Sequence, residues 1–276
     1  MAGILEGMSI GFVGAGAMAE AMLRGLAESG ARLSASDPDP ARRRKMQEEL
    51  GIEAMAENTR LAAGARVVVL AVKPQVAPGV LAEIGPCLRP GQTLLSIVAG
   101  LRIAALARHV PGGIGIIRAM PNAPALIGAG ITGVAFGGEA GEDLEEIARA
   151  VLAPLGRVAI VPEALLDAVT GLSGSGPAYV ALFAEALVEG GVKAGLPRAI
   201  AAELTVWTLL GAARLLAAGE TPVSLRERVT SPGGTTAYGL YALERGGLRA
   251  AVIEAVAAAS GRAAELGRIF GEDTEE

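Results

Sequence analysis

Apolar residues up to about Pro162 occur in short continuous runs, and the segments between these runs carry apolar residues at helical spacing. The first run, Ile10–Val13, is followed by an apolar stripe at Met18, Met22 and Leu26. Continuous apolar runs alternating with helices predict a parallel sheet with helices on both faces. The further strands that we expect are Arg32–Ser36, Arg66–Val72, Thr93–Val98, Gly115–Ala119, Ile131–Phe136 and Arg157–Val161, and the helices are Pro40–Leu50, Val76–Ile84, Ile103–His109 and Leu144–Leu155.

After Pro162 the alternation stops, and no segment predicts a strand. The helices that we expect in this part are Pro177–Ala194, Pro197–Ala218, Val223–Val229, Thr235–Arg245 and Leu248–Ile269. We therefore divide the chain into an α/β domain at residues 8–162 and an all-α domain at residues 163–270, with no linker-like sequence between them.

The predicted helices of the second domain carry apolar residues on more than one face, among them Leu182, Leu204 and Trp207. A helix that is apolar all round is buried all round, and one small bundle cannot cover all of these side chains. A second copy of the chain can cover them, which predicts a homodimer. The alternative is a closely packed monomeric bundle.

A glycine-rich turn follows the first strand and precedes the first helix, with the spacing Gly14-x-Gly16-x-x-Ala19. The first glycine permits a tight turn, the second lets a pyrophosphate approach the backbone, and the small third residue lets the helix pack on the strand. Backbone N–H groups at the helix start then face an anion. The motif predicts a Rossmann-type dinucleotide site, and the alternative is an ordinary turn of an α/β core.

An acidic residue at the end of the second strand accepts hydrogen bonds from the adenosine ribose in such folds. Ser36 and Asp37 occupy this position. An aspartate there accepts from a free 2′-hydroxyl and repels a 2′-phosphate, which favours NADH. The basic run Arg42–Lys45 follows closely, and guanidinium groups can bind phosphate. We expect this run to be a solvated helix face whose arginines have no fixed partner.

Composition excludes several classes of protein. The 276-residue chain has a net charge of −5 and one basic tract, which argues against nucleic-acid binding. A single cysteine, Cys87, excludes an internal disulfide and a cysteine metal cluster, and no metal site is expected. Prolines and glycines interrupt the uncharged segment Ala119–Gly138, so we expect no membrane span there, and the start of the chain does not resemble a signal peptide. We expect a cytoplasmic protein.

Three loops rich in small residues follow predicted parallel strands, at Val72–Gln75, Val98–Gly100 and Met120–Pro124. Ligands bind at the carboxyl ends of strands in open α/β sheets, so these loops belong on the cofactor side. A fourth loop, Thr230–Thr236, lies between two predicted helices and contains glycines and hydroxyls. It predicts a site for a carboxylate, with a helix turn capped by threonine as the alternative.

Strong acid–base candidates are scarce. The single histidine, His109, lies away from every glycine loop, and we expect it to be structural. Lys73 follows a central strand, and Lys193 lies on a predicted helix. Carbonyl reduction requires a proton donor, whereas an imine nitrogen is basic enough to be protonated before hydride arrives. The composition of the loops therefore favours a reaction that depends on positioning.

The chain resembles the Δ1-pyrroline-5-carboxylate reductases, which reduce a cyclic imine to L-proline with NADH or NADPH. The matching segments, in the order of that family, are IGFVGAGAMA (Ile10–Ala19), AVKPQ (Ala71–Gln75), AG (Ala99–Gly100), IRAMPNAPA (Ile117–Ala125), TGLSGSGPAYV (Thr170–Val180), GVKAGLPR (Gly191–Arg198) and VTSPGGTTAYGLYALE (Val229–Glu244). The resemblance implies an oxidoreductase of proline biosynthesis with an all-helical dimerisation domain and an assembly of dimers, often a larger ring.

The resemblance also implies site residues. The substrate would be held by Ser231, Gly234, Thr235 and Thr236, with the Thr236 hydroxyl at the ring nitrogen as the catalytic contact. Together with the strand-end reasoning above, it predicts cofactor contacts from Val13, Gly14, Ala15, Gly16, Ala17, Met18, Ala19, Ser36, Asp37, Asn58, Val72, Lys73, Pro74 and Ala99.

Two features depart from the family, and two other activities stay open. The family commonly has Asn or Gln where this chain has Ala17, and a small neutral or hydroxyl residue where it has Asp37. Asp37 is the reason to expect NADH to be used at least as well as NADPH. A β-hydroxyacid dehydrogenase would use Lys193 as its acid–base residue, and a non-catalytic dinucleotide sensor would not need the hydroxyls of Ser231–Thr236.

Overall fold

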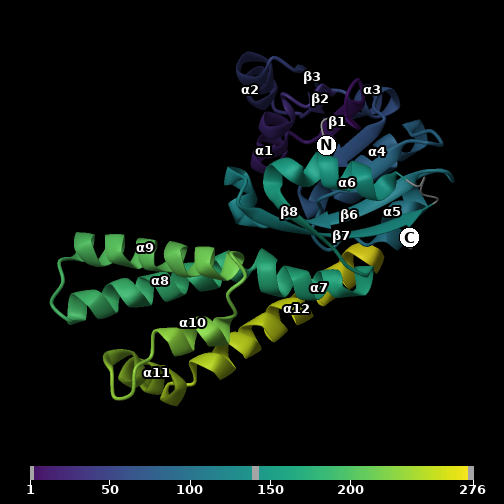
Figure 1. Cartoon of the computed structure of the whole chain (residues 1–276). Coiled ribbons are helices and arrows are strands. Elements are labelled where there is room, and N and C mark those ends of the chain that lie inside the picture. The colour runs from purple at the N-terminus through teal and green to yellow at the C-terminus, as the bar shows by residue number, and fades with distance from the viewer. Residues whose placement is uncertain (1–2, 139–142, 273–276) are drawn as a thin grey trace. The chain divides into compact units, whose positions relative to one another are not determined.

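The computed structural model describes residues 3–138 and 143–272. Its strands form an eight-stranded sheet in the order β3-β2-β1-β4-β5-β6-β7-β8 (Figure 1). The strands are β1 (Ser9–Val13), β2 (Arg32–Ser36), β3 (Glu53–Met55), β4 (Val67–Leu70), β5 (Thr93–Ser96), β6 (Gly115–Met120), β7 (Gly130–Gly138) and β8 (Gly156–Ile160). All seven predicted strands are present, and β3 was missed because it is three residues long and pairs at the edge of the sheet.

The direction of the strands differs from the prediction at one end of the sheet. Strands β1 to β6 are parallel, whereas β7 runs antiparallel to β6 and β8 runs parallel to β7. The connection from β6 to β7 holds a single 3₁₀ segment, Ala123–Ile127, and is too short for the crossover that a parallel pair requires. The wholly parallel prediction was therefore wrong for β7 and β8. The parallel part keeps the order 3-2-1-4-5-6 of dinucleotide-binding sheets.

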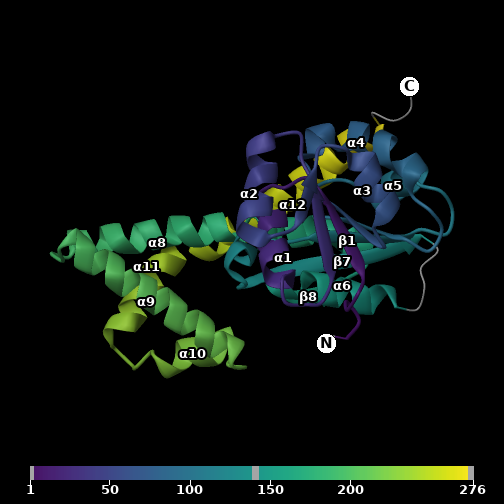
Figure 2. The same ribbon diagram turned by 90° about the horizontal axis from the view of Figure 1, so that it is seen from above.

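Helices on the two faces of the sheet bury two apolar cores, which confirms the doubly wound fold. Alternate residues of one strand enter different cores: Val69 of β4 packs with α1, α2 and α6, and Leu70 packs with α3, α4 and α5. Figure 2 shows α1 and α2 on one side of β1, with α3 to α5 on the other. These helices span Ala17–Leu26 (α1), Pro40–Leu50 (α2), Asn58–Gly64 (α3), Ala77–Ile84 (α4), Ile103–His109 (α5) and Leu144–Leu152 (α6).

Local sequence signals explain the bounds of α2, which match the prediction. The side chain of Asp39 accepts from the backbone N–H of Ala41 at 2.8 Å and so caps the helix N-terminus. Pro40 occupies the first turn, where its missing N–H costs nothing, and Gly51 ends the helix in the left-handed conformation at φ 65°.

Packing divides the chain into two units. The described residues up to Gly174 and from Ala258 onward form one, here called the sheet unit, and Ser175–Ala257 form the other, the helical unit. The segment after Pro162 belongs to the sheet unit because Arg118 of β6, whose side chain is buried, contacts Glu163 at 2.9 Å and Asp167 at 3.8 Å. A short helix, α7 (Leu166–Val169), and a π-helical turn at Thr170–Gly174 complete this segment.

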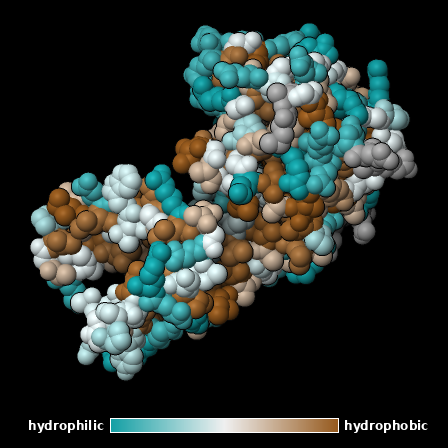
Figure 3. Space-filling view, in the orientation of Figure 1, coloured by the Kyte–Doolittle hydropathy of each residue, from teal (hydrophilic) through white to brown (hydrophobic). Residues whose placement is uncertain are grey.

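The other regular elements of the chain after Pro162 are helical throughout the described residues, as predicted. They are α8 (Gly176–Lys193), α9 (Arg198–Ala217), α10 (Pro222–Arg228), α11 (Thr235–Arg245) and α12 (Leu248–Glu272), of which α12 starts in the helical unit and continues into the sheet unit. Helices α8, α10 and α11 contain no buried residue, and α9 buries Ala201 and Thr205 alone. Trp207 of α9 is 62% exposed. Figure 3 shows apolar side chains at the surface of these helices.

By length and composition, one helix among the described residues could cross a membrane. This helix is α9, Arg198–Ala217, and 11% of its apolar window is buried. The same test is met by apolar helices that pack against protein, and α9 packs along α8 within the helical unit.

Candidate active site

A cleft of about 580 Å³ opens at the carboxyl ends of β1, β2 and β4. It lies at the switch point of the sheet, where β1 pairs with β2 on one side and with β4 on the other. Its lining residues are Gly14, Gly16, Ala17, Ser36, Asp37, Pro38, Arg42, Ala56, Asn58, Ala71, Val72, Lys73, Val76 and Val80. Ser36 has no surface exposed to water and forms part of the floor.

A second hollow of about 320 Å³ continues from the same glycine-rich turn. It brings the turn together with the loops after β4, β5 and β6, which the parallel direction of these strands places at one edge. Its lining residues are Gly16, Ala17, Met18, Ala71, Val72, Lys73, Ile97, Ala99, Met120 and Pro121.

Most of the predicted cofactor residues line these two hollows, and the exceptions have structural reasons. Val13, Ala15 and Ala19 are buried in the core, and Pro74 begins a 3₁₀ turn outside both linings. Met120 and Pro121 belong to the loop Met120–Pro124, which was predicted to lie on the cofactor side, and they line the second hollow. The direction of β6 was the signal for their position.

The glycine-rich turn has room for a diphosphate. Gly14 has φ +96°, and a Cβ there would lie 2.6 Å from the carbonyl oxygen of Ala71, so a side chain is excluded. A Cβ on Gly16 would meet a single neighbouring atom, Arg42 Nη1 at 3.4 Å, which leaves open space above the backbone. No side chain caps α1, so its first N–H groups are free for an anion. These observations fit the pyrophosphate of a dinucleotide.

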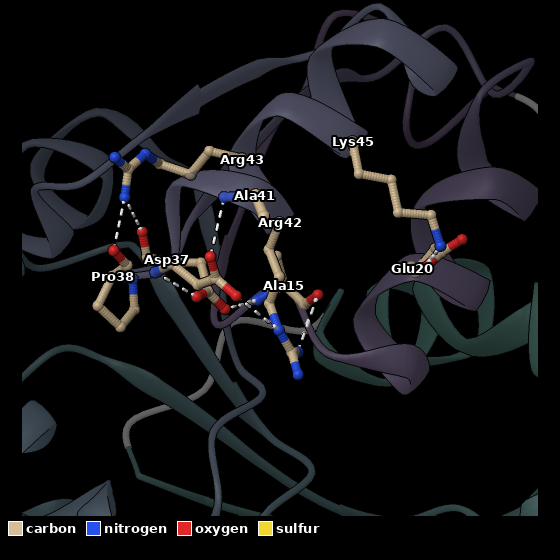
Figure 4. Close-up of polar contacts among 9 residues, drawn as sticks. Ala15, Glu20, Asp37, Pro38, Ala41, Arg42, Arg43 and Lys45 are labelled. Carbon is tan, nitrogen blue, oxygen red and sulfur yellow. Dashed lines mark hydrogen bonds and ion pairs between the residues drawn. The ribbon is translucent and has the colours of Figure 1, made fainter.

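Asp37 accepts a hydrogen bond from the backbone of the glycine-rich turn and also lines the cleft. Its Oδ2 accepts from the backbone N–H of Ala15 at 2.9 Å, and its Oδ1 accepts from that of Asp39 at 2.9 Å (Figure 4). The residue is 8% exposed. Each carboxylate oxygen has a further lone pair, so the group can still accept from a ligand hydroxyl. The predicted ribose contact therefore comes with a second task, the positioning of the glycine-rich turn.

The basic face of α2 is exposed to solvent at Arg42, Arg44 and Lys45, as predicted, but the expectation that its arginines lack fixed partners was wrong for Arg42 and Arg43. Arg43 Nη1 donates to the carbonyl oxygens of Asp37 at 2.7 Å and Pro38 at 2.8 Å. Arg42 lines the cleft, and its Nη1 donates to the carbonyl oxygen of Ala15 at 3.4 Å (Figure 4). The helical turn brings Arg42 to the glycine-rich turn, which sequence spacing alone does not reveal.

An ion-pair cluster joins α1 to α2 beside the cleft. Glu20 accepts from Lys45 at 2.8 Å and from Arg24 at 2.7 Å. The hydrogen bond from Lys45, followed by that from Arg24, lowers the pKa of Glu20 below its ordinary value. The cluster fixes the packing of the two helices that flank the turn.

The hydroxyl-rich loop lies in the helical unit, at the start of α11. Gly234 occupies the N-cap position with no side-chain cap, so the first N–H groups of the helix lack intrahelical acceptors. Ser231, Thr235 and Thr236 make no side-chain hydrogen bond within the described residues. A threonine-capped turn is therefore not what the structure contains. A Cβ on Gly234 would lie 2.3 Å from Ser231 Oγ, which shows how closely this hydroxyl approaches the backbone.

Of the other acid–base candidates, His109 and Lys193 lie outside the linings of the two hollows, whereas Lys73 belongs to both linings. His109 ends α5, and its Nδ1 lies 3.0 Å from the carbonyl oxygen of Ala105. Lys193 is exposed in the last turn of α8, where a cation complements the helix dipole.

The fold and the cleft define a dinucleotide-dependent oxidoreductase. Two family models match the chain: "Pyrroline-5-carboxylate reductase dimerisation" at residues 163–266 and "NADP oxidoreductase coenzyme F420-dependent" at residues 9–100. The pyrroline-5-carboxylate reductase of Synechocystis is 45% identical over 95% of this chain and 99% of its own length. The chain belongs to the pyrroline-5-carboxylate reductase family.

Solved structures agree with this assignment. A pyrroline-5-carboxylate reductase from Coxiella burnetii superposes with a TM-score of 0.89 at 35% identity, covering 95% of this chain and 99% of that one. The Plasmodium falciparum enzyme, solved with NADP bound, superposes with a TM-score of 0.84 at 32% identity over 95% of this chain and 99% of its own. The chain is thus an oxidoreductase that uses a nicotinamide cofactor.

Proposed function

We propose that the cleft of the sheet unit and the loop at the start of α11 serve one reaction, the reduction of Δ1-pyrroline-5-carboxylate to L-proline, which is the activity of the family. The assignment of residues rests on the chemical groups that each unit offers to a ligand. One unit offers a glycine-rich anion site at a sheet switch point, and the other offers uncapped N–H groups beside free hydroxyls.

We assign cofactor binding to the two hollows of the sheet unit. Gly14 and Gly16 and the first turn of α1 would hold the pyrophosphate, Asp37 and Asn58 the adenosine side, and Val72, Lys73 and Ala99 the nicotinamide side. The bound cofactor supplies a hydride. Arg42 lies at Ala15 and Gly16, so we assign it to the pyrophosphate that NADH and NADPH share.

The substrate carboxylate would dock on Ser231, Gly234 and Thr235, where the helix start favours an anion. Thr236 would place its hydroxyl at the ring nitrogen. An imine nitrogen is protonated before it is reduced, so the residues need to orient it and no strong side-chain acid is required.

We further propose that NADH is used at least as well as NADPH. The buried carboxylate of Asp37 is held in place by two backbone N–H groups and faces the cleft, where it would accept from a ribose hydroxyl and repel a phosphate. The Nη1 group of Arg43, which could otherwise donate to a 2′-phosphate, donates to two backbone carbonyls.

The matched dimerisation model indicates that the chain self-associates. We propose a homodimer, or a ring of dimers, formed through residues 163–270, with residues 8–162 as the dinucleotide-binding domain. The exposed apolar side chains of α8 to α12 support this, and their burial between copies would account for the apolar character of α9 without a membrane. We propose a cytoplasmic enzyme whose partners are its small-molecule substrate and its own copies, and not nucleic acid.

Absorbance of the reduced nicotinamide tests the proposal. Purified protein is mixed with pyrroline-5-carboxylate and either NADH or NADPH, and both initial rates are measured. We expect turnover with both cofactors and catalytic efficiency with NADH at least equal to that with NADPH. Turnover of hydroxyacids in place of the imine would favour a dehydrogenase acting through Lys193. Cofactor binding without turnover would favour a sensor.

A further inference from the structure

Three polar side chains from three elements form a chain of hydrogen bonds along one wall of the cleft. The Ser36 hydroxyl, at the end of β2, donates to Asn58 Oδ1 at 2.8 Å. Asn58 Nδ2, at the start of α3, donates to Glu83 Oε2 at 2.9 Å. Asn58 lines the cleft, whereas Glu83 lies on α4 outside the lining. The three residues are called the Ser36–Asn58–Glu83 relay below.

The direction of the relay is determined by Glu83. A carboxylate only accepts hydrogen bonds, so the Asn58 atom that faces it must be the amide nitrogen. The amide oxygen of Asn58 then faces Ser36, whose hydroxyl must donate. Ser36 is fully buried, and a buried hydroxyl without a partner costs free energy, which further favours this orientation.

The relay determines which polar atoms of Asn58 are available to a ligand. Glu83 engages one of the two N–H groups of its amide nitrogen, and its oxygen, which accepts from Ser36, retains a second lone pair. Asp37 beside it also offers acceptors. Acceptors match the hydroxyls of a free ribose, whereas a phosphate needs donors.

We propose that Glu83 is a positioning residue that sets cofactor preference through Asn58. By engaging one of the two N–H groups of the Asn58 amide, Glu83 reduces the donors that a 2′-phosphate could use and so favours a ribose with a free 2′-hydroxyl. The inference rests on the proposed binding of the adenosine part of the cofactor in this cleft.

The test compares three variants of the full chain. Glu83→Ala removes the acceptor and frees the engaged N–H of Asn58, and Glu83→Gln removes the charge while its carboxamide oxygen can still accept from that N–H. Glu57→Ala is the matched control, because Glu57 precedes Asn58, is exposed and makes no capping hydrogen bond. Each protein is titrated calorimetrically with ADP-ribose and with 2′-phospho-ADP-ribose, and its thermal unfolding is recorded.

We expect Glu83→Ala to raise the ratio of affinity for 2′-phospho-ADP-ribose to affinity for ADP-ribose by about tenfold, as for one added hydrogen bond to a charged group. Glu83→Gln and Glu57→Ala should keep the wild-type ratio, and all four proteins should unfold at similar temperatures.

Three outcomes would overturn the inference. An unchanged ratio in Glu83→Ala removes Glu83 from cofactor selection, and an equal shift in Glu83→Gln or Glu57→Ala assigns the effect to charge alone. A wild-type protein that binds neither fragment contradicts the assignment of the cleft itself, which distinguishes failure of the proposed function from failure of the relay.

Discussion

The sheet unit and the helical unit bury their apolar residues in different ways. Strands β1, β4 and β5 and the helices around them place their apolar side chains in two cores formed within the unit, where Phe12 and Leu95 have no exposed surface. Helices α8, α10 and α11 bury no residue, and Trp207 and Leu204 of α9 are more than half exposed. The sheet unit is stabilised by its own packing, whereas the helical unit exposes apolar side chains of the kind that the proposed self-association would bury.

The two units also build their candidate sites differently. The cleft of the sheet unit depends on contacts between residues far apart in sequence, such as Asp37 with the backbone of Ala15. The loop at the start of α11 depends on local geometry, with an uncapped helix start and nearby hydroxyls. We therefore expect substitutions in the two units to impair different properties of the protein.

The largest effect should come from a charge placed on the exposed apolar face of the helical unit. Trp207→Glu should weaken self-association by about 2 kcal/mol or more, as for a central aromatic at an interface. The same change at Ile127, which is 82% exposed in the sheet unit, should leave assembly intact. Sedimentation velocity at micromolar concentration measures both, and an unchanged assembly in Trp207→Glu would show that α9 lies outside the interface.

In the glycine-rich turn, we expect Gly14 to be required for folding and Gly16 to be required for cofactor binding. Gly14→Ala forces a side chain into a positive φ and against the Ala71 carbonyl, which should cost about 1–3 kcal/mol of stability. Gly16→Ala meets one atom at ordinary contact distance, so its unfolding temperature should stay near that of the wild type while cofactor affinity falls. Thermal unfolding and cofactor titration measure the two effects. Equal unfolding temperatures for the two variants would contradict the steric argument.

Asp37 should control the preference between the two cofactors. Asp37→Ser removes the carboxylate that faces the ribose, and we expect the efficiency ratio of NADPH to NADH to rise about tenfold, which corresponds to about 1.4 kcal/mol. Asp39→Ser removes the same charge nearby but retains an N-cap residue for α2, so its ratio should stay at the wild-type value. If both variants shift equally, general electrostatics and not the Asp37 contact sets the preference.

Thr236→Ala should mainly lower the turnover number. The loss of one neutral hydrogen bond corresponds to about 0.5–1.5 kcal/mol. Thr230→Ala is the control, because the Thr230 hydroxyl is engaged by the Arg226 carbonyl at 2.6 Å. Steady-state kinetics with saturating cofactor measure the effect. A Thr236→Ala enzyme with wild-type turnover would remove this hydroxyl from the mechanism.

The smallest effect should come from the ion pairs between α1 and α2. Lys45→Gln removes the main cause of the lowered Glu20 pKa and should cost about 0.2–1 kcal/mol at neutral pH. A lowered folded-state pKa stabilises the protein above the ordinary value of 4.5, and this contribution is lost as the pH falls through the folded pKa. The difference between Lys45→Gln and wild type in urea unfolding should therefore disappear well below pH 4.5. Arg44→Gln, on the same helix, should show no such pH dependence.

Elements that nearby residues determine were predictable from the sequence. Helices α2, α5 and α11 have the bounds that the sequence predicts, because capping residues, prolines and apolar spacing act within a few positions. The turn at Gly14 and Gly16 was predictable for the same reason. The short strand β3 and the short helix α3 lacked a pattern long enough to detect.

What the sequence determined by itself is the alternation of elements, the glycine-rich anion site and the apolar excess of the helical half. Tertiary structure decided the reversal of β7 and the contacts of Asp37 and Arg42 with the glycine-rich turn. It also decided the relay from Ser36 to Glu83. These contacts join residues many positions apart, and their geometry depends on how strands align and helices pack, which no local pattern specifies.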